Sequence, residues 1–342
     1  MKQHKIKIIN KQDVTIFLKT LIQDFELYAP MIQRDVVKLG VVKSPEEVVF
    51  NYVNTVNSVK EAVLPQSEAL LRYTTDSGSQ EITVDLHKTR TRVIFGIRPC
   101  DARSVVFLDK VFMSEDYRDP YYQRYREDMV LISIGCNKLG QGCFCNSVNG
   151  SPMSTEGSDV MLVDIGDEYA VQVLTDKGRN LISKFSLTDA NENQLSRMNA
   201  TITQAEKTNQ PEISTDGIKE KLDVLFKDTL WDSLTEKCIS CGVCTFLCPT
   251  CYCFDIVDET NSKKGARMRI WDSCQFPQFT LQASGFNPRP SSKERYRQRI
   301  MHKFSYCIDN QRVIGCVGCG RCVRECPVNL DIREILKAVQ NA

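Results

Sequence analysis

The chain has 342 residues, of which 42% are hydrophobic, and its formal net charge is +1. Such a balanced charge gives no indication of nucleic-acid binding. The sequence shows neither a signal peptide nor a run of the ~18 apolar residues that a membrane span needs. We therefore expect a cytoplasmic protein of two domains, without a membrane span and without a nucleic-acid partner.

The first half of the chain predicts alternating helices and strands. Residues 14–29 carry a helical stripe of apolar side chains, and residues 100–112 predict a helix that begins beside Cys100 with Asp101 as its cap. Short apolar runs rich in β-branched residues predict strands at 91–99, 128–136, 159–166 and 169–174. This alternation indicates an α/β domain.

A polar segment separates this half from the rest. Residues 205–217 have the composition of a linker, and the chain beyond them favours helices apart from its cysteine-containing loops. We predict an α/β domain over residues 1–215 and a helical, two-cluster ferredoxin-like domain over residues 216–342. The predicted fold class is therefore α+β/α.

Sixteen cysteines are the unusual feature of the composition. Disulfide frameworks belong mainly to small secreted proteins, so clustered cysteines in a reducing compartment indicate metal ligands. An oxidised 4Fe–4S cluster held by four thiolates adds a charge of about −2. The loaded protein would therefore be acidic.

Two copies of one motif carry the strongest signal. The pattern Cys-x2-Cys-x2-Cys-x3-Cys-Pro begins at Cys238 and again at Cys316. Three cysteines on a tight loop hold one cubane cluster, whereas the fourth ligates the other cluster in two-cluster ferredoxins. We therefore predict two 4Fe–4S clusters with exchanged fourth ligands. The ligand sets are Cys238, Cys241, Cys244 and Cys326 for one cluster, and Cys316, Cys319, Cys322 and Cys248 for the other.

Zinc is the alternative at these two sites, since paired Cys-x2-Cys knuckles also bind zinc. The repeated spacing and the proline after each fourth cysteine disfavour it. Residues 249–315 separate the motifs, which is too long for a compact bacterial ferredoxin and suggests a helical insertion. Three glycines would let the backbone approach the sulfurs closely: Gly242, Gly318 and Gly320.

The first domain contains four further cysteines, Cys100, Cys136, Cys143 and Cys145. Cys100 and Cys136 each follow a predicted strand, so a parallel strand pair would bring both to one edge of the sheet. The other two lie in a Gly- and Asn-rich loop. Buried free cysteines are the alternative, but this composition favours a metal site, and we prefer a 4Fe–4S cluster over zinc.

A fourth set of candidate ligands lies between the two motifs. Three of them are Cys251, Cys253 and Cys274, and either His302 or Cys307 would complete a four-ligand site. The first two cysteines would share one face of an extended segment. Zinc and iron–sulfur clusters both accept histidine beside cysteine. We prefer a 4Fe–4S cluster because the site would adjoin a ligand of the ferredoxin pair; free core cysteines are the alternative.

Several segments together resemble one family. They are "RPCD", "GCFCN", "CISCGVCTFLCPTCYCF", "WDSCQF", "NPRPSSKERYRQRIMHK" and "GCVGCGRC". The family is the iron–sulfur β subunit of cytoplasmic hydrogenase/sulfur reductase (sulfhydrogenase), which is similar to the corresponding iron–sulfur subunit of anaerobic sulfite reductase. The resemblance implies histidine or cysteine at the position of His302. A ligand tolerates that exchange, and we therefore prefer His302 to Cys307.

The resemblance also implies a function. Subunits of this family perform no catalysis and carry electrons between a flavoprotein subunit, which binds FAD and oxidises NAD(P)H, and a catalytic reductase or hydrogenase subunit. We expect the same role here, with no catalytic residue. The alternative is a self-sufficient iron–sulfur oxidoreductase with a flavin or substrate site in the α/β domain. A zinc-rich scaffold or nucleic-acid binder is a third hypothesis, which iron and sulfide contents would test.

Overall fold

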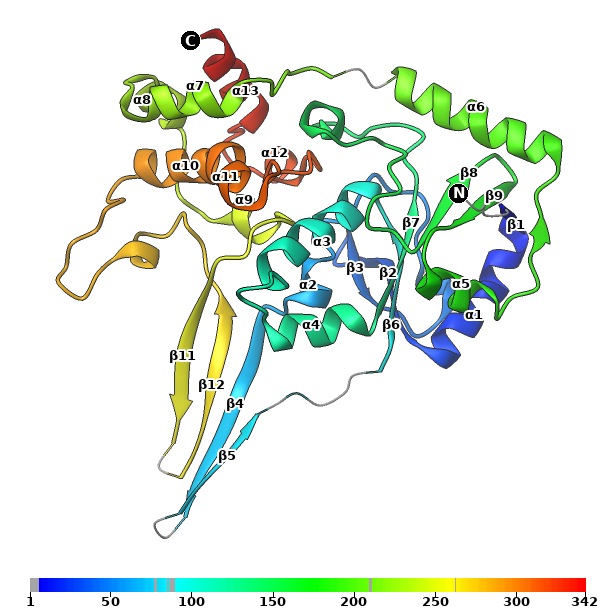
Figure 1. Ribbon diagram of the computed structural model, residues 1–342, viewed down its shortest axis with the longest axis horizontal. Coiled ribbons are helices and arrows are strands. Elements are labelled where there is room, and N and C mark those ends of the chain that lie inside the picture. The colour runs from blue at the N-terminus through cyan, green and yellow to red at the C-terminus, as the bar shows by residue number, and fades with distance from the viewer. Residues whose placement is uncertain (1–5, 77–78, 85, 87–89, 209–210, 262) are drawn as a thin grey trace.

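An eight-stranded mixed sheet forms the centre of the N-terminal half (Figure 1). The computed structural model describes residues 6–76, 79–84, 86, 90–208, 211–261 and 263–342. The strand order is β10–β1–β9–β8–β7–β6–β2–β3, and the four strands β2, β6, β7 and β8 run parallel. The strands are β1 (Lys7–Asn10), β2 (Glu26–Gln33), β3 (Val36–Val41), β6 (Arg92–Ile97), β7 (Met129–Ile134), β8 (Val160–Asp164), β9 (Glu168–Val173) and β10 (Thr188–Asp189).

Helices cover both faces of this sheet because its central strands are apolar on both sides. Alternate residues of β6 enter different cores: Phe95 packs with α1 and α5, whereas Ile94 packs with α3 and α4. A long helix, α6, covers β8 and β9 through Met198 and Ala205. The helices of this half are α1 (Val14–Asp24), α2 (Lys60–Val63), α3 (Pro99–Phe112), α4 (Pro120–Glu127), α5 (Asp176–Ile182) and α6 (Glu192–Thr208).

The structure confirms the four predicted strands and the parallel pairing of β6 with β7. The helix predicted over residues 14–29 is too long: it ends at Asp24, because the next residues belong to β2 at the edge of the parallel strands. The predicted cap of α3 is also wrong. Arg98 occupies the N-cap position, Pro99 begins the helix, and the Asp101 carboxylate binds Arg321 instead.

The predicted linker over residues 205–217 is only partly irregular. α6 continues to Thr208, since its apolar face still packs on the sheet there through Ala205. Farther along, Ile213 is buried in the core of the C-terminal half. The segment therefore packs against both halves of the chain.

The C-terminal half consists mainly of short helices around a second centre. Trp231, Ile300, Phe304 and Leu336 are fully buried there. The helices are α7 (Ile218–Val224), α8 (Leu230–Thr235), α9 (Val243–Phe246), α10 (Ser292–Met301), α11 (Cys307–Gln311), α12 (Arg321–Arg324) and α13 (Ile332–Asn341). A π-helical turn, His302–Tyr306, joins α10 to α11.

The insertion between the motifs is not wholly helical, which corrects the prediction. It begins with a hairpin of β11 (Phe254–Thr260) and β12 (Lys264–Trp271), and β12 pairs with β4 (Ser67–Asp76), which pairs with β5 (Ser79–Val84). These four strands form the arm that projects downward in Figure 1. The hairpin is a strand pair because β4, far away in the sequence, provides its partner edge. Among the described residues, no helix is long and apolar enough to cross a membrane.

Candidate metal centres

The first motif surrounds a hollow that is also lined by Cys322 and Cys326 of the second motif. Cys238, Cys241, Cys244 and Cys326 line this first hollow, which has about 370 Å³ of empty volume. Gly242, at φ +76°, turns the chain into α9 between two of these cysteines. The structure thus gathers around one space the four residues that the sequence assigns to one cluster.

The second motif lies deeper, and Cys248 of the first motif lies against it. Cys248, Cys316 and Cys319 are buried. Cys248 interacts electrostatically with all three thiols of the second-motif loop, namely Cys316, Cys319 and Cys322. Burial raises the pKa of the first two of these thiols to about 11. The metal-free thiols therefore keep their protons, which a metal would have to displace.

Gly318 and Gly320 allow the second motif to pack against the loop that follows β7. Their φ angles are +64° and +73°. A Cβ atom on Gly318 would lie 2.5 Å from the backbone nitrogen of Cys145, and one on Gly320 would lie 2.6 Å from the carbonyl carbon of Gly142. The Phe144 amide donates to the Gly318 carbonyl at 2.8 Å. Both the left-handed backbone and the lack of space require glycine here.

The four cysteines of the α/β region line a second hollow, of about 340 Å³. The parallel strands β6 and β7 place Cys100 in the first turn of α3 and Cys136 just after β7. Cys143 and Cys145 complete the set, and Cys319 of the second motif lines the same hollow. The Cys143 thiol donates to the Cys319 carbonyl at 3.6 Å. The contribution of Cys319 escaped the sequence reasoning, because no local pattern links the two segments.

The remaining candidate ligands line a third hollow, of about 310 Å³. They are Cys251, Cys253, Cys274, His302 and Cys307. The neighbouring Cys253 thiol lowers the pKa of Cys274 to about 6. The Thr250 hydroxyl, which lines the same hollow, lies 3.3 Å from the sulfur of Cys248. The third hollow therefore adjoins a cysteine that the sequence assigns to the second-motif cluster.

His302 begins the π-helical turn, a conformation that occurs frequently at functional sites. Burial lowers the pKa of His302 to about 4, so its imidazole is neutral, the form that binds metals. Its Nε2 atom lies 3.0 Å from the hydroxyl of Tyr252. A hydrogen bond of this kind fixes the orientation of a ligating ring. Cys307, the other candidate, lies on the far side of the same turn.

The described residues include no group of three or more His, Cys, Asp or Glu side chains close enough together to hold a single metal ion. Instead, the cysteines line three hollows. Several sulfur donors around one shared space suit an iron–sulfur cluster, for which thiolates are the usual ligands.

Comparisons with known proteins agree with this interpretation of the cysteines. Residues 237–330, which contain both motifs, match the 4Fe-4S dicluster domain. The chain is also 29% identical over 330 residues to sulfhydrogenase 2 subunit beta from Pyrococcus furiosus, and the alignment covers 95% of each chain. The chain is a homologue of that subunit. No solved structure matches it significantly.

These matches confirm the resemblance inferred from the sequence, and they support two 4Fe–4S clusters in the dicluster region. They also agree with the predicted order of an α/β region followed by a dicluster domain. The N-terminal cysteine set lies outside the matched residues 237–330, whereas the set around the third hollow lies within them.

Buried cations accompany the cysteines. Five lysine and arginine side chains are buried beside cysteine thiols: Lys60, Arg98, Arg299, Lys303 and Arg321. One signal was present in the sequence. Arg295, Arg299 and Lys303 recur every four residues, so they share one face of the helix and its π-turn extension. A basic stripe next to cysteine motifs could have indicated buried counter-charges.

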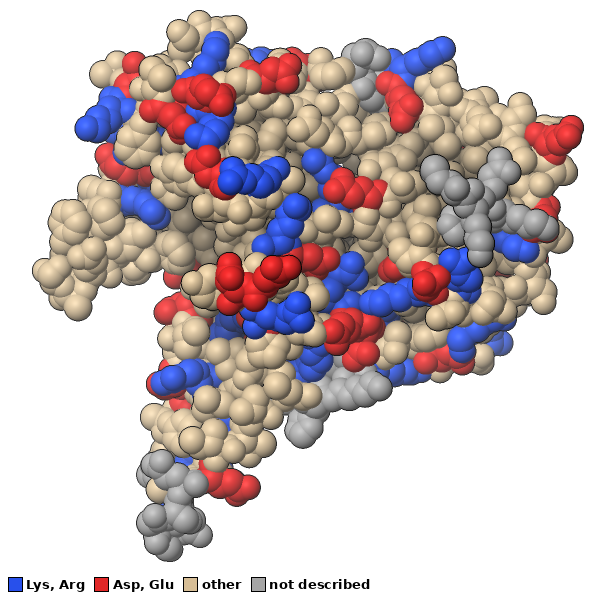
Figure 2. Space-filling view, viewed as in Figure 1, with Lys and Arg blue, Asp and Glu red and all other residues tan. Residues whose placement is uncertain are grey.

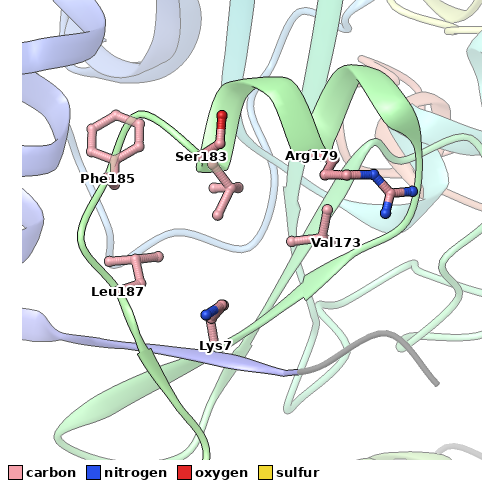
Figure 3. A pocket seen from close by; sticks show the side chains of 7 residues that line it. Lys7, Val173, Arg179, Ser183, Phe185 and Leu187 are labelled. Atoms are coloured by element: carbon pink, nitrogen blue, oxygen red, sulfur yellow. The ribbon is translucent and has the colours of Figure 1, made fainter.

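A pocket with about 730 Å³ of empty volume lies away from the cysteines, beside β1, β9 and α5 (Figure 3). Val173, Phe185 and Leu187 are among its lining residues. Lys7 at its rim is paired with Asp189 at 2.7 Å. Its described lining contains no histidine, cysteine or carboxylate. The polar groups of its lining are the side chains of Lys7, Arg179 and Ser183.

Proposed function

We propose that the chain is the iron–sulfur electron-transfer subunit of a sulfhydrogenase-type complex. It relays electrons between a catalytic subunit of the sulfite/sulfur reductase or hydrogenase type and an NAD(P)H-linked flavoprotein subunit. Two findings support this role: the chain is homologous to a protein named as a sulfhydrogenase β subunit, and it contains a dicluster domain. Because the chain itself performs no substrate chemistry in this proposal, its cysteines serve only to hold and connect redox centres.

One observation carries the proposal: the second-motif ligand set touches every other cysteine set. Cys319 lines the second hollow, and Cys322 lines the first. Lys303, which lines the third hollow, donates a hydrogen bond to the Cys248 sulfur at 3.3 Å. Metal sites that only stabilise a fold have no need to adjoin one another, whereas a relay does. The second-motif centre is thus the junction of the proposed path.

We assign four 4Fe–4S clusters to the relay. Two belong to the dicluster region, with Cys248 and Cys326 exchanged between the motifs. The third occupies the second hollow, and the fourth occupies the third hollow with His302 as its fourth ligand. Zinc is the alternative occupant of the last two sites, and metal analysis of the purified protein separates the two assignments.

The first hollow provides a route to the surface. Cys241 and its neighbour Ile239 are exposed. The segment between Pro277 and Ser291 projects from the same half of the molecule, and Figure 2 shows almost no charge on its visible face. Leu281 and Phe286 are exposed on it. At this surface we place the electron exchange with one partner subunit.

The test is anaerobic purification of the chain alone and together with its partner proteins. The isolated chain should contain iron and sulfide in nearly equal amounts, about sixteen atoms each for four clusters, and no flavin. NAD(P)H should reduce its clusters only when the flavoprotein subunit is present. Bound flavin and substrate turnover by the isolated chain would overturn the proposal in favour of a self-sufficient oxidoreductase.

A matched pair of variants tests the junction. Cys319→Ser should abolish electron flow from NAD(P)H to the catalytic subunit while the complex still assembles. Lys293→Met is the control, because this partly exposed lysine of α10 pairs with Asp232 at the surface, away from the hollows. Unimpaired electron flow through the Cys319→Ser complex would mean that the second-motif centre is not on the path.

A further inference from the structure

Three buried cations converge on the third hollow. Arg299 and Lys303 line it directly. Lys60 approaches from α2 of the N-terminal half, and all three act electrostatically on Cys251. Their exposed fractions are only 2%, 4% and 2% for Arg299, Lys303 and Lys60. This site thus collects positive charge from two distant parts of the chain.

The two lysines have no carboxylate partner among the described residues, and their hydrogen bonds go to neutral groups. Lys60 donates to the carbonyls of Thr245 and Phe246, at 3.4 and 3.1 Å, and its ammonium lies 3.7 Å from the centre of the Trp271 ring. Lys303 donates to the Gly315 carbonyl at 2.8 Å.

Lys303 also donates to the thiol of Cys248 at 3.3 Å and to the Thr250 hydroxyl at 2.9 Å. This lysine therefore links a ligand of the second-motif centre to the third hollow. Elsewhere the protein neutralises a buried cation with a carboxylate, as it does for Arg321 with Asp101. The charge of Lys303, by contrast, faces sulfur.

Arg299, which lines the same hollow, has unpaired donors. One of its terminal nitrogens, Nη2, donates to the Cys244 carbonyl at 3.0 Å. Its Nε and Nη1 are buried and have no hydrogen-bond partner within the described part of the chain. Leaving a buried donor unpaired costs about 1–3 kcal/mol, and an uncompensated buried charge costs more. The hollow is therefore built for an anionic group that carries hydrogen-bond acceptors, as sulfur-rich clusters do.

We propose that Lys60, Arg299 and Lys303 make the centre in the third hollow the highest-potential station of the relay, which is reduced first and holds an electron. This inference rests on the proposed function, since it requires a redox-active cluster at this site. Reduction adds one negative charge, and three nearby cations in a low-dielectric interior stabilise it. Net charge and hydrogen bonds to sulfur are the quantities that set cluster potentials.

The step is a one-electron transfer in which no bond forms or breaks. The electron originates from the reduced flavin of the partner flavoprotein. It arrives by way of the second-motif centre, which is reoxidised. The second hollow has a weaker positive environment: Arg98 lies beside Cys100 and Cys136, but Arg321 is neutralised by Asp101. This difference in charge favours reduction of the centre in the third hollow over that of the centre in the second hollow.

The test is a potentiometric EPR titration of the full-length protein, with iron, sulfide and zinc measured on each sample. Cys251→Ser first identifies the signal that belongs to the third hollow. In the wild type this signal should be reduced before the others. In Lys60→Met and Lys303→Met the reduction potential of this centre should fall. At a fixed applied potential the ratio of reduced to oxidised centre should decrease about tenfold, which corresponds to 59 mV for a one-electron couple.

Two further variants keep the outcome decisive. Lys303→Arg retains the positive charge, so the potential of the third-hollow centre should stay close to its wild-type value. Lys293→Met, on the surface of α10, should leave the potential of every centre unchanged. If the Lys303→Met protein loses iron, the Lys60→Met protein provides the test instead, because the Lys60 side chain does not line the hollow. An unshifted signal in Lys60→Met with full iron content, or a third-hollow signal reduced last in the wild type, would overturn the inference. Loss of zinc in Cys251→Ser would overturn it as well, while leaving a three-cluster relay intact.

Discussion

The guanidinium of Arg321 binds the carboxylate of Asp101 through two hydrogen bonds, of 2.8 and 3.0 Å, in the interior of the protein. Arg321 follows directly on Gly320 in the second motif, and Asp101 adjoins Cys100 in the first turn of α3. One ion pair therefore fixes the position of the dicluster loop against the N-terminal cysteines. The same arginine donates to the Thr55 carbonyl at 2.8 Å and so binds a third segment of the chain.

Arg321→Ala should destabilise the protein strongly. It leaves the Asp101 carboxylate buried without a counter-charge, which typically costs about 3–5 kcal/mol. We expect a lower midpoint of anaerobic thermal unfolding and faster loss of iron on heating. The matched control is Arg267→Ala, whose ion pair with Asp258 lies at the surface and should contribute little to stability because solvent screens it. Equal effects of the two substitutions would contradict the role assigned to the buried pair.

Gly318→Ala should impair the docking of the second motif much more than a glycine substitution elsewhere. Gly217 provides the comparison, since its φ of +63° nearly equals that of Gly318, +64°, but a Cβ atom there would meet nothing within 4 Å. Both substitutions add left-handed strain of about 1–2 kcal/mol. Only Gly318→Ala also collides with the backbone of Cys145. Thermal midpoints and iron contents of the two variants measure the difference; if they coincide, the close approach has no energetic weight.

Cys326→Ser should alter the same EPR signal as Cys241→Ser, because both residues line the first hollow. Cys248→Ser should instead share its altered signal with Cys319→Ser. This pairing follows from the exchange of fourth ligands between the motifs. Spectra in which Cys326→Ser matches Cys319→Ser would show that each motif supplies all four ligands of one cluster.

The double variant Cys143→Ser/Cys145→Ser should remove one cluster and leave the dicluster signals in place. Both residues line the second hollow, and the loss should amount to about four iron atoms per chain. Iron and zinc analysis with EPR of the full-length protein measures it. An unchanged metal content would mean that these cysteines are free thiols, and the loss of one zinc would make the site structural.

His302→Ala and Cys307→Ser separate the two candidates for the last ligand of the third hollow. We expect His302→Ala to change the signal of that centre and to lower the iron content. Cys307→Ser should leave both unchanged, because Cys307 is only 1% exposed and packs in the apolar core beside α3. The reverse result would assign Cys307 as the ligand and leave His302 as a core residue that binds Tyr252.

The sequence predicted those features that depend on local pattern. The strand runs before Cys100 and Cys136 were clear, and parallel pairing then placed both cysteines at one edge of the sheet. The hairpin of β11 and β12 was missed because its sequence is rich in charge and its stabilising partner is β4. Arg269 shows why: it is buried only because Glu68 and Asp119 accept its hydrogen bonds.

The candidate metal sites also combine features encoded locally with features that depend on remote segments. Spacing predicted the two ferredoxin motifs, since that ligand pattern is encoded within a few residues. Lys60 comes from a remote segment, so no sequence pattern around the cysteines reveals it. Asp101 is the instructive error. Its position near the start of a helix suits a cap, but in the structure its carboxylate binds Arg321, which is remote in the sequence.

The pairing of β4 with β12 also constrains how the protein is made. Glu68 and Arg269 are neighbours in the register although 201 residues separate them. While the ribosome synthesises the intervening chain, β4 has an unpaired edge of the kind that promotes aggregation. Cys326 and the second motif emerge later still. In the assignment proposed here, both dicluster centres need cysteines of the second motif, so iron and sulfide can complete them only after nearly the whole chain has been translated.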